Sequence, residues 1–242
     1  SPHHTASDSA LVGGGKVPSV GEISLSHNGV LFLDEFIEFK SNVLQALRQP
    51  LEDREITVSR ASGSFTFPAD FMLVAATNPC HCGYYFDEEI SCHCPMGKIE
   101  MYLRKIAGPM LDRIEIEILV GRVPFRDLTE VRASESSREI RRRVISAREA
   151  QNERFRRSAT KYNSRMTPEE AERFCPLRET ARRLMETAML KMKLTARSYY
   201  KILRVARSIA DLGGDETVRE EHLLEALSYK NLQKNYDRAL KN

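Results

Sequence analysis

The chain has 242 residues, of which 41% are hydrophobic and 29% are charged, a balance typical of a globular protein with a core of its own. No apolar run approaches the roughly 20 residues that cross a bilayer, and no signal-peptide pattern opens the chain, so we expect a cytoplasmic protein with no membrane partner. The net charge of +3 is too small to indicate nucleic-acid binding by itself.

Residues 1–124 are predicted to form an α/β domain with a parallel sheet. A short apolar run after a turn predicts a buried strand at Val30–Leu33, which we expect to be covered on both faces. A helix is expected over 41–49, ending at Pro50, followed by a β-hairpin over 55–67 with a polar tip. Further strands are predicted at 71–76 and, from alternating isoleucines, at 114–120.

Residues 125–242 are predicted to form an all-helical domain. Thr167 followed by Pro168 is a typical helix start, and Gly213 with Gly214 is a typical helix end. The other helices are expected over 126–155, 177–191, 195–212 and 217–228. Between Arg126 and Arg157, ten arginines stand against six acidic residues, which is consistent either with a solvated helix held by ion pairs or with a surface that faces phosphate.

Polar side chains follow two of the predicted strands where each strand ends. Asp34 and Glu35 come directly after the first strand, and Asn78 follows the strand at 71–76. Charges are costly to bury, and open α/β sheets bind ligands at the carboxyl ends of their strands. An Asp-Glu pair at such an edge is typical of the Walker-B element, in which the Asp helps to hold Mg²⁺ and the Glu orients or deprotonates the attacking water. The alternatives are a strand that ends at a charged turn and an Asn that is an ordinary turn residue.

Arg113 stands immediately before the predicted strand at 114–120. A fixed guanidinium at such a junction can stabilise charge on a transferred phosphoryl group, often in the neighbouring subunit of a ring. The alternative is a salt bridge to Asp112 or Glu115.

Five cysteines in a chain without an export signal predict a reducing compartment. Cys80 and Cys82 form one Cys-x-Cys pair, and Cys92 and Cys94 form a second. Four thiolates can form a closed tetrahedral Zn²⁺ site with a structural role, although the usual spacing within each pair is wider. The alternative is a reduced loop without metal. Cys175 lies alone in a predicted helical region and is expected to be a buried or inert thiol.

Several motifs occur in order along nearly the whole chain, and together they resemble the magnesium-chelatase-like AAA+ proteins, most closely the ComM/YifB subfamily. The motifs are Pro2-His-His-Thr-Ala-Ser7, Leu11-Val-Gly-Gly-Gly15, Gly21-Glu-Ile-Ser-Leu25, His27-Asn-Gly-Val-Leu-Phe-Leu-Asp-Glu35, Leu47-Arg-Gln-Pro-Leu-Glu52, Phe71-Met-Leu-Val-Ala-Ala-Thr-Asn-Pro-Cys80 and Leu111-Asp-Arg-Ile114. The recurrence of separate motifs at matching spacing is far more specific than any one of them.

The resemblance implies a role for each matching residue. Asp34 and Glu35 correspond to the Walker-B pair, and Asn78 corresponds to the sensor-one residue. Arg113 resembles an arginine finger that acts on a neighbouring subunit. Arg197, within Leu194-Thr-Ala-Arg-Ser198, resembles the sensor-two contact to the γ-phosphate from a helical lid. The implied ligands are ATP and Mg²⁺, and the implied assembly is a homo-oligomeric ring, a hexamer.

Two further segments resemble the hairpin insertions of the clade that includes chelatase motors and MCM helicases. They are residues 8–26 and 55–67. In ring helicases such hairpins point into the pore and touch DNA, so Lys16 and Arg60 are the candidate DNA contacts, through charge rather than base readout. The alternative is that both are ordinary surface hairpins.

The chain departs from the family pattern at the phosphate loop. No Gly-x-x-x-x-Gly-Lys-Ser/Thr occurs, and the glycine-rich run that ends at Lys16 continues with Val17 and Pro18 rather than with a helix start. In the relatives that the sequence resembles, this loop and a Lon-protease-like domain lie upstream of the Pro-His-His-Thr motif. Because the chain has no initiator Met, we expect it to be truncated just after the loop, and to bind ATP poorly and hydrolyse none by itself.

The leading functional hypothesis is a ring-forming ATP-driven motor that acts on DNA, as in branch migration during natural transformation. The first alternative is a chelatase-type or protein-remodelling AAA+ subunit that uses the same ATP site. The second is a non-enzymatic interaction module that carries zinc. The basicity of the two hairpins separates the first two hypotheses, because only a DNA motor needs phosphate contacts there.

Overall fold

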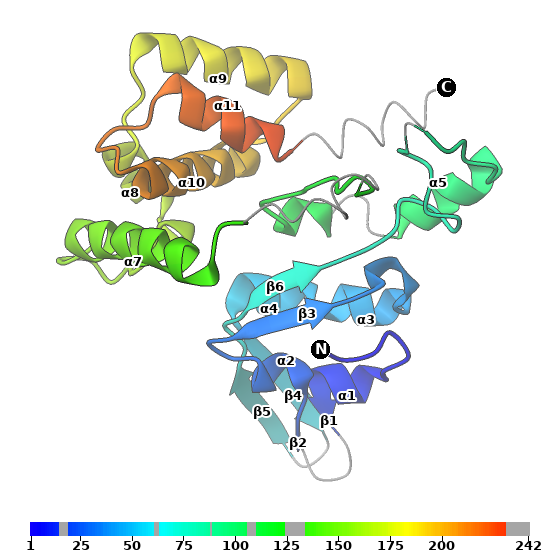
Figure 1. The fold of residues 1–242 in the computed structure, drawn as a ribbon. Helices are drawn as coiled ribbons and strands as arrows, with labels where there is room; N and C mark the ends of the chain where they lie inside the picture. Colours follow the sequence, from blue (N-terminus) through cyan, green and yellow to red (C-terminus); the bar gives the residue numbers. More distant parts are fainter. Residues whose placement is uncertain (15–18, 61–62, 88, 106–109, 124–133, 231–242) are drawn as a thin grey trace. The chain divides into compact units, whose positions relative to one another are not determined.

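The computed structural model describes residues 1–14, 19–60, 63–87, 89–105, 110–123 and 134–230. The chain divides into two compact units, residues 1–114 and residues 115–242, and each is drawn in Figure 1. The domain boundary predicted between residues 124 and 125 falls outside the described residues and stays a prediction, and Lys16 lies outside them as well.

The first unit is a mixed α/β structure, as the sequence predicts. In chain order its elements are α1 (Asp8–Val12), β1 (Gly13–Gly14), β2 (Ser19–Val20), α2 (Glu22–Leu25), β3 (Val30–Leu33), the 3-10 turn η1 (Phe36–Glu38), α3 (Ser41–Ala46), α4 (Arg48–Asp53), β4 (Glu55–Arg60), β5 (Gly63–Pro68), β6 (Met72–Ala75), α5 (Met96–Arg104) and the 3-10 turn η2 (Leu111–Arg113). The strands form three pairs: β1 with β2, β3 with β6, and β4 with β5.

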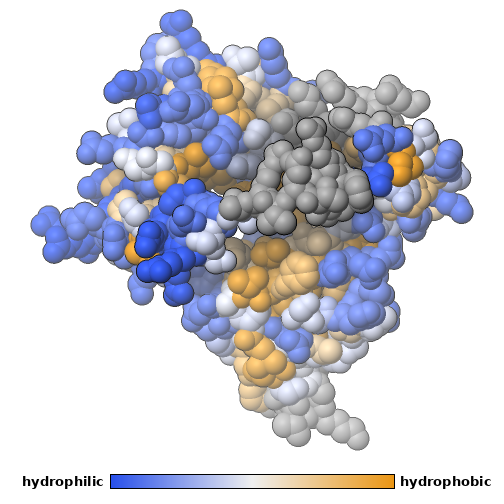
Figure 2. Space-filling model, in the orientation of Figure 1, coloured by the Kyte–Doolittle hydropathy of each residue, from blue (hydrophilic) through white to orange (hydrophobic). Residues whose placement is uncertain are grey.

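The parallel pair of β3 and β6 is covered on one face and exposed on the other. Leu31 and Leu33 are fully buried, whereas Val30 and Phe32 are 52% and 37% exposed, because successive side chains of a strand point to opposite faces. Figure 2 shows the hydrophobic atoms gathered over these strands. The prediction that the first strand is buried on both faces is therefore wrong for the described chain, in which β3 and β6 pair only with each other.

The helix predicted over 41–49 differs from the prediction at its end. The structure has two short helices, α3 and α4, joined at Leu47, and Pro50 is the third residue of α4 rather than a stop. Proline is tolerated there because the first N–H groups of a helix have no partner within it.

The strand predicted at 114–120 is not formed. The backbone N–H of Glu117 donates to the carbonyl of Tyr229 at 3.0 Å, and the Glu117 carboxylate pairs with Lys230 at 3.1 Å. Glu115 also pairs with Lys201 on a helix of the second unit, at 3.1 Å. The alternating isoleucines thus mark an extended segment held by the helical unit rather than a strand of the sheet.

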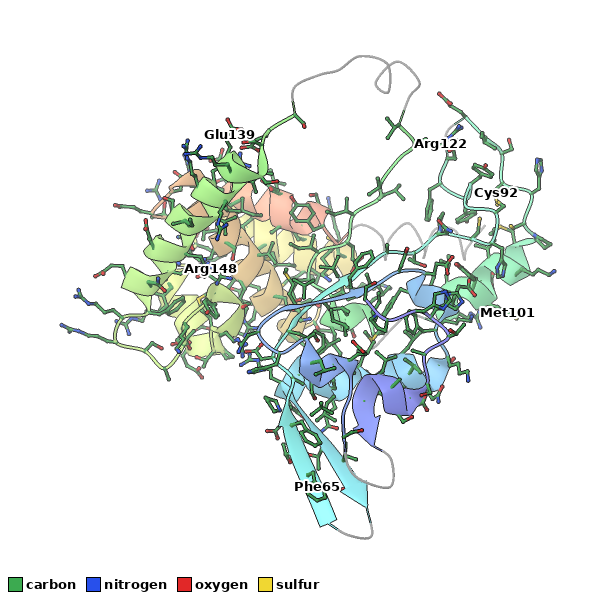
Figure 3. All side chains as sticks on the ribbon, turned by 60° about the horizontal axis from the view of Figure 1, so that its bottom comes forward. Phe65, Cys92, Met101, Arg122, Glu139 and Arg148 are labelled. Carbon is green, nitrogen blue, oxygen red and sulfur yellow. The ribbon has the colours of Figure 1, made fainter. Side chains whose placement is uncertain are left out.

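The predicted hairpin over 55–67 is confirmed. β4 and β5 pair antiparallel from Glu55 opposite Pro68 to Arg60 opposite Gly63, and Phe65 is seen on this hairpin in Figure 3. The segment 8–26 contains a second, shorter antiparallel pair in which Gly13 faces Val20. Its backbones approach so closely that a Cβ on Gly13 would lie 2.4 Å from the Ser19 carbonyl oxygen, so only glycine fits.

The second unit is helical and confirms the predicted helix start at Thr167 and the helix end at Gly213 and Gly214. The helices predicted over 126–155 and 217–228 begin later than predicted in the described residues, at Ser137 and Glu220. Its elements are α7 (Ser137–Arg154), the 3-10 turn η3 (Asn163–Arg165), α8 (Pro168–Phe174), α9 (Glu179–Met192), α10 (Ala196–Gly213) and α11 (Glu220–Ser228). Thr167 caps α8 in a reciprocal capping box with Glu170, and α10 ends at Gly214 in the left-handed conformation. Among the described helices, none combines the length and the apolar character needed to span a bilayer.

A buried charge network ties the helices of this unit together. Asp211, on α10, accepts hydrogen bonds from Arg154 on α7 and from Arg207 one turn earlier on α10, at 2.7 and 3.1 Å. Asn163 donates to the same carboxylate at 2.7 Å. Arg207 and Asp211 have side chains only 1% exposed, so the pair is isolated from water.

We expect Asp211→Ala to lower the free energy of unfolding by about 3–5 kcal/mol, because it leaves buried guanidinium groups without their carboxylate. The measurement is chemical denaturation followed by helical circular dichroism. Arg183→Ala is the matched control: it also breaks an i,i+4 ion pair, with Glu179, but the two side chains are 74% and 66% exposed, so the loss should stay below about 1 kcal/mol. Equal losses in the two variants would contradict a structural role for the buried network.

Candidate active site and metal centre

The parallel register brings the predicted Walker-B and sensor-one residues to one edge of the strand pair. Leu33, the last residue of β3, lies opposite Ala75, the last residue of β6. Two backbone hydrogen bonds extend the contact beyond the ladder: Ala76 N–H donates to Leu33 O and Phe36 N–H donates to Ala76 O, both at 2.9 Å. Asp34 and Glu35 therefore begin where β3 ends, and Asn78 follows three residues after β6.

All three side chains face solvent. Asp34, Glu35 and Asn78 are exposed, and the Asp34 carboxylate accepts a hydrogen bond from the Glu35 N–H at 2.9 Å. Carboxylate oxygens on an open edge are the donors that Mg²⁺ prefers, and an exposed edge leaves room for the waters that this ion retains. The residues present therefore fit the magnesium side of a nucleotide site, whereas the 242 residues contain no phosphate loop to complete it.

The structure shows two features of Glu35 that the sequence does not predict: an ion-pair partner, His4, and a left-handed backbone conformation. His4 Nδ1 lies 2.7 Å from the Glu35 carboxylate, and the His4 ring packs edge-on against Phe39. Glu35 itself has a φ of 50°, in the left-handed region that costs a residue with a side chain about 1–2 kcal/mol. Strain of this kind is concentrated at functional sites, where the surrounding structure enforces it.

The structure pairs Arg113 with Glu52, a partner not considered from the sequence. Arg113 Nη2 lies 2.8 Å from a carboxylate oxygen of Glu52 at the end of α4, and the Arg113 side chain is largely buried. This ion pair connects two motifs of the sequence, Leu47 to Glu52 and Leu111 to Ile114. The finger role in a neighbouring subunit stays a prediction.

Arg197 belongs to the second unit and lies in the first turn of α10. Thr195 caps this helix by accepting a hydrogen bond from the Ser198 N–H at 3.2 Å, and the Arg197 side chain is exposed. The local geometry thus presents a cation at a helix start, where the helix dipole slightly disfavours it. The sensor-two role also stays a prediction.

The four clustered cysteines converge to the geometry of a tetrahedral metal site. Their sulfur atoms all lie within 4.8 Å of one another, and those of Cys80, Cys82 and Cys92 are 3.4 to 3.7 Å apart. Tetrahedral Zn²⁺ with bonds of about 2.3 Å requires sulfurs about 3.8 Å apart. The short Cys-x-Cys spacing therefore does not prevent metal binding, because the loop brings the four sulfur atoms of the two pairs close together. Figure 3 shows Cys92 in this cluster, close to the helix that carries Met101.

The thiols of the cluster differ in acidity. A hydrogen bond from the backbone at Tyr84, helped by the neighbouring thiols, lowers the pKa of Cys82 to about 6. Burial raises the pKa of Cys92 to about 12. A coordinated dication removes this difference, because it deprotonates every thiol that binds it. Cys175 is buried among the helices of the second unit, as predicted, and burial raises the pKa of its thiol to about 11.

A parallel strand pair with acidic and amide groups at its carboxyl edge, followed by a helical region, is consistent with an AAA+-like protein. Residues 1–128 match the family of magnesium chelatase, subunit ChlI, and residues 134–230 match the C-terminal region of the same subunit. Since the first match alone covers more than half of the chain, the chain belongs to the magnesium-chelatase-like family, and its curated relatives include ComM and YifB proteins.

The relatives are longer than this chain. It is 45% identical over 230 residues to the competence protein ComM of Haemophilus influenzae, and 41% and 40% identical over 231 residues to the uncharacterized proteins YifB of Escherichia coli and Salmonella typhimurium. Each match covers 95% of this chain but 44% of the relative. The chain thus spans less than half the length of the curated relatives it matches.

Sequence reasoning missed three residues that the structure places at the site. His4 holds Glu35, Glu52 holds Arg113, and Tyr102 lies buried beside Thr77. His4 and Glu52 lie within motifs that the chain shares with the family, so the sequence marks their positions but does not indicate what they contact. Tyr102 stands in no motif, and only its contacts in the fold identify it.

We expect the purified chain to contain one zinc ion held by the cysteine cluster, measured by elemental analysis. Cys82→Ser should lower the zinc content to near zero and accelerate zinc release to a chromogenic chelator, because three thiolates leave the tetrahedral site open. Cys175→Ala, which removes a thiol of the second unit, is the control and should retain the metal. Wild-type protein that is free of zinc after purification without chelators would contradict the site.

Proposed function

We propose that this chain supplies the magnesium- and water-handling part of the ATP site in a ring-forming AAA+ motor that acts on DNA in the cytoplasm. The observation that carries the proposal is the parallel register of β3 and β6, in which Leu33 lies opposite Ala75. It gives Asp34, Glu35 and Asn78 a common edge although some forty residues of chain separate them. The chain covers 44% of the length of its ComM relative. We propose that the phosphate-binding elements lie in a longer form of the protein, whose activity is the one to be tested.

Each residue at this edge has a task that its chemistry suits. Bound Mg²⁺-ATP supplies a γ-phosphoryl group that is open to attack by water. Asp34 would help to hold the metal, and Glu35 would orient or deprotonate the attacking water. Asn78 hydrogen-bonds the γ-phosphate and the same water. The contact between His4 and Glu35 fixes the carboxylate at the edge, so that its oxygens are placed before substrate arrives.

Two arginines complete the proposed site from elsewhere in the assembly. Arg113 acts as a finger on the neighbouring subunit, so that turnover would depend on the ring, and its ion pair with Glu52 restrains the guanidinium. Arg197 reaches the γ-phosphate from the helical unit, which serves as a lid. A guanidinium that contacts the transferred group accelerates phosphoryl transfer by about 10³–10⁵ in known enzymes. We propose a hexamer as the ring.

The two hairpins support DNA as the partner. In Figures 1 and 3, β1–β2 and β4–β5 project from the same end of the first unit. β4 and β5 pair over six residues, and most of β5 is exposed, whereas Ile56 and Val58 of β4 are buried. Arg60 is the last residue of β4 and, in sequence, Lys16 lies between β1 and β2. A cation on each hairpin suits contact with a phosphate backbone.

We expect Glu35→Gln in the complete protein to lower kcat for ATP by about 10²–10⁴-fold, because the amide cannot take a proton from water. Nucleotide affinity should change little, since Glu35 is not a phosphate ligand. The measurements are steady-state phosphate release and equilibrium binding of a fluorescent nucleotide. Glu149→Gln, a matched change at an exposed position of α7, is the control and should leave both unchanged. Wild-type turnover in the glutamine variant would contradict the role of Glu35.

We expect replacement of Lys16 and Arg60 by Ala to weaken DNA binding and to reduce the slope of log K against log salt by about 1 for each lost phosphate contact. The measurement is fluorescence anisotropy with single- and double-stranded oligonucleotides across a salt series. The charge-matched control replaces Lys191 and Arg183, which are exposed on α9. An unchanged slope of log K against log salt in the hairpin variant would contradict the DNA proposal and favour a chelatase-type or protein-remodelling subunit.

A further inference from the structure

One helix joins the cysteine cluster to both strand ends of the candidate active site. The cluster begins at Cys80, two residues after Asn78, and ends at Cys94, two residues before α5. Between these cysteines the described residues form turns and bends without a helix or strand. The position of α5 relative to the strands is therefore not set by the local backbone, and the four sulfurs are the point at which the two ends of this segment meet.

Tyr102 connects α5 to both strand ends. Its side chain is buried, with 5% of the residue exposed, and its hydroxyl lies close to the side chains of Glu38 and Thr77. Glu38 lies in the turn that follows Glu35, and Thr77 is the neighbour of Asn78. Burial, with the Glu38 carboxylate next in effect, raises the pKa of Tyr102 to about 12, so the hydroxyl stays protonated at physiological pH.

Two further contacts hold the same surfaces together. Lys105, just after α5, donates from its ammonium group to the Ile37 carbonyl at 3.2 Å. The ring of His81, which stands between two cysteines of the cluster, lies 4.6 Å from the ring of Tyr102. Ile99 and Leu103, on the apolar side of α5, are buried as well. The cluster, α5 and the turn after Glu35 thus form one continuous set of contacts.

We propose that a Zn²⁺ held by Cys80, Cys82, Cys92 and Cys94 acts as a brace that fixes α5, and through Tyr102 fixes the two strand ends that carry Glu35 and Asn78. Tyr102 is a positioning residue in this arrangement and touches no substrate. The inference rests on the proposed ATPase function for its catalytic consequence, but its structural part does not need it. The metal is structural, and its influence on turnover passes entirely through the placement of the active-site groups.

The test compares three forms of the complete protein by hydrogen exchange with mass spectrometry: wild type with zinc, wild type stripped of zinc, and Tyr102→Phe with zinc. We expect loss of zinc to increase exchange at least about fivefold in the peptides that cover residues 36–39 and 76–80. Tyr102→Phe should retain zinc by elemental analysis and increase exchange in the same peptides. Tyr229→Phe, which also removes a hydroxyl bonded to a carboxylate, but in the second unit, is the control and should leave these peptides unchanged.

Kinetics give the second readout. For zinc-free protein and for Tyr102→Phe we expect a fall in kcat of about tenfold or more and a KM within about twofold of wild type, because the acid and the amide are displaced rather than removed. Re-addition of zinc should restore the stripped wild type. Unchanged exchange in residues 36–39 and 76–80 on zinc removal, or in Tyr102→Phe, would overturn the brace. A wild type without ATP turnover would refute the proposed function, while the exchange data would still decide on the brace.

Discussion

Everything at the candidate site depends on the parallel pairing of β3 with β6. The register places Leu33 opposite Ala75. Backbone hydrogen bonds from Ala76 to Leu33 and from Phe36 to Ala76 keep the two segments paired just beyond the ends of the strands. A slip of one residue would turn Leu31 and Leu33 out of the core, so burial fixes the register strongly. The same burial therefore fixes the place at which Asp34, Glu35 and Asn78 leave the strands.

A pair of strands by itself is only marginally stable and does not hold exposed charged side chains in fixed positions. Other parts of the first unit contact the residues at the end of the pair. His4 reaches back from the start of the chain to Glu35, and α5 contacts the turn after Glu35 through Tyr102 and Lys105. Both supports act on side chains or turns rather than on the ladder itself. This division suits an active site, in which the strands supply position and the neighbouring contacts restrain the groups that react.

The sequence predicted best what is local. Helix caps at Thr167 and Gly214, the hairpin over 55–67 and the two strands were all predicted, because turn chemistry and apolar periodicity act over a few residues. The strand at 114–120 was predicted wrongly because its pattern is that of a strand, while its partner, the carbonyl of Tyr229, lies more than a hundred residues away. The contacts of His4, Glu52 and Tyr102 are equally long-range, and no local pattern announces them. The apolar runs alone place Asp34 and Asn78 at strand ends, whereas the sensor and finger roles of Asn78, Arg113 and Arg197 follow from the motifs shared with a family.

The central claim is that one strand edge receives Mg²⁺ and the terminal phosphate of ATP. The most direct measurement is a cryo-electron microscopy map of the complete protein with Mg²⁺ and a slowly hydrolysed ATP analogue. We predict density for the metal beside Asp34, with the γ-phosphate facing Asn78 and a water within reach of Glu35. Nucleotide bound elsewhere on the protein, with the edge formed by residues 34–35 and 78 open to solvent, would contradict the claim.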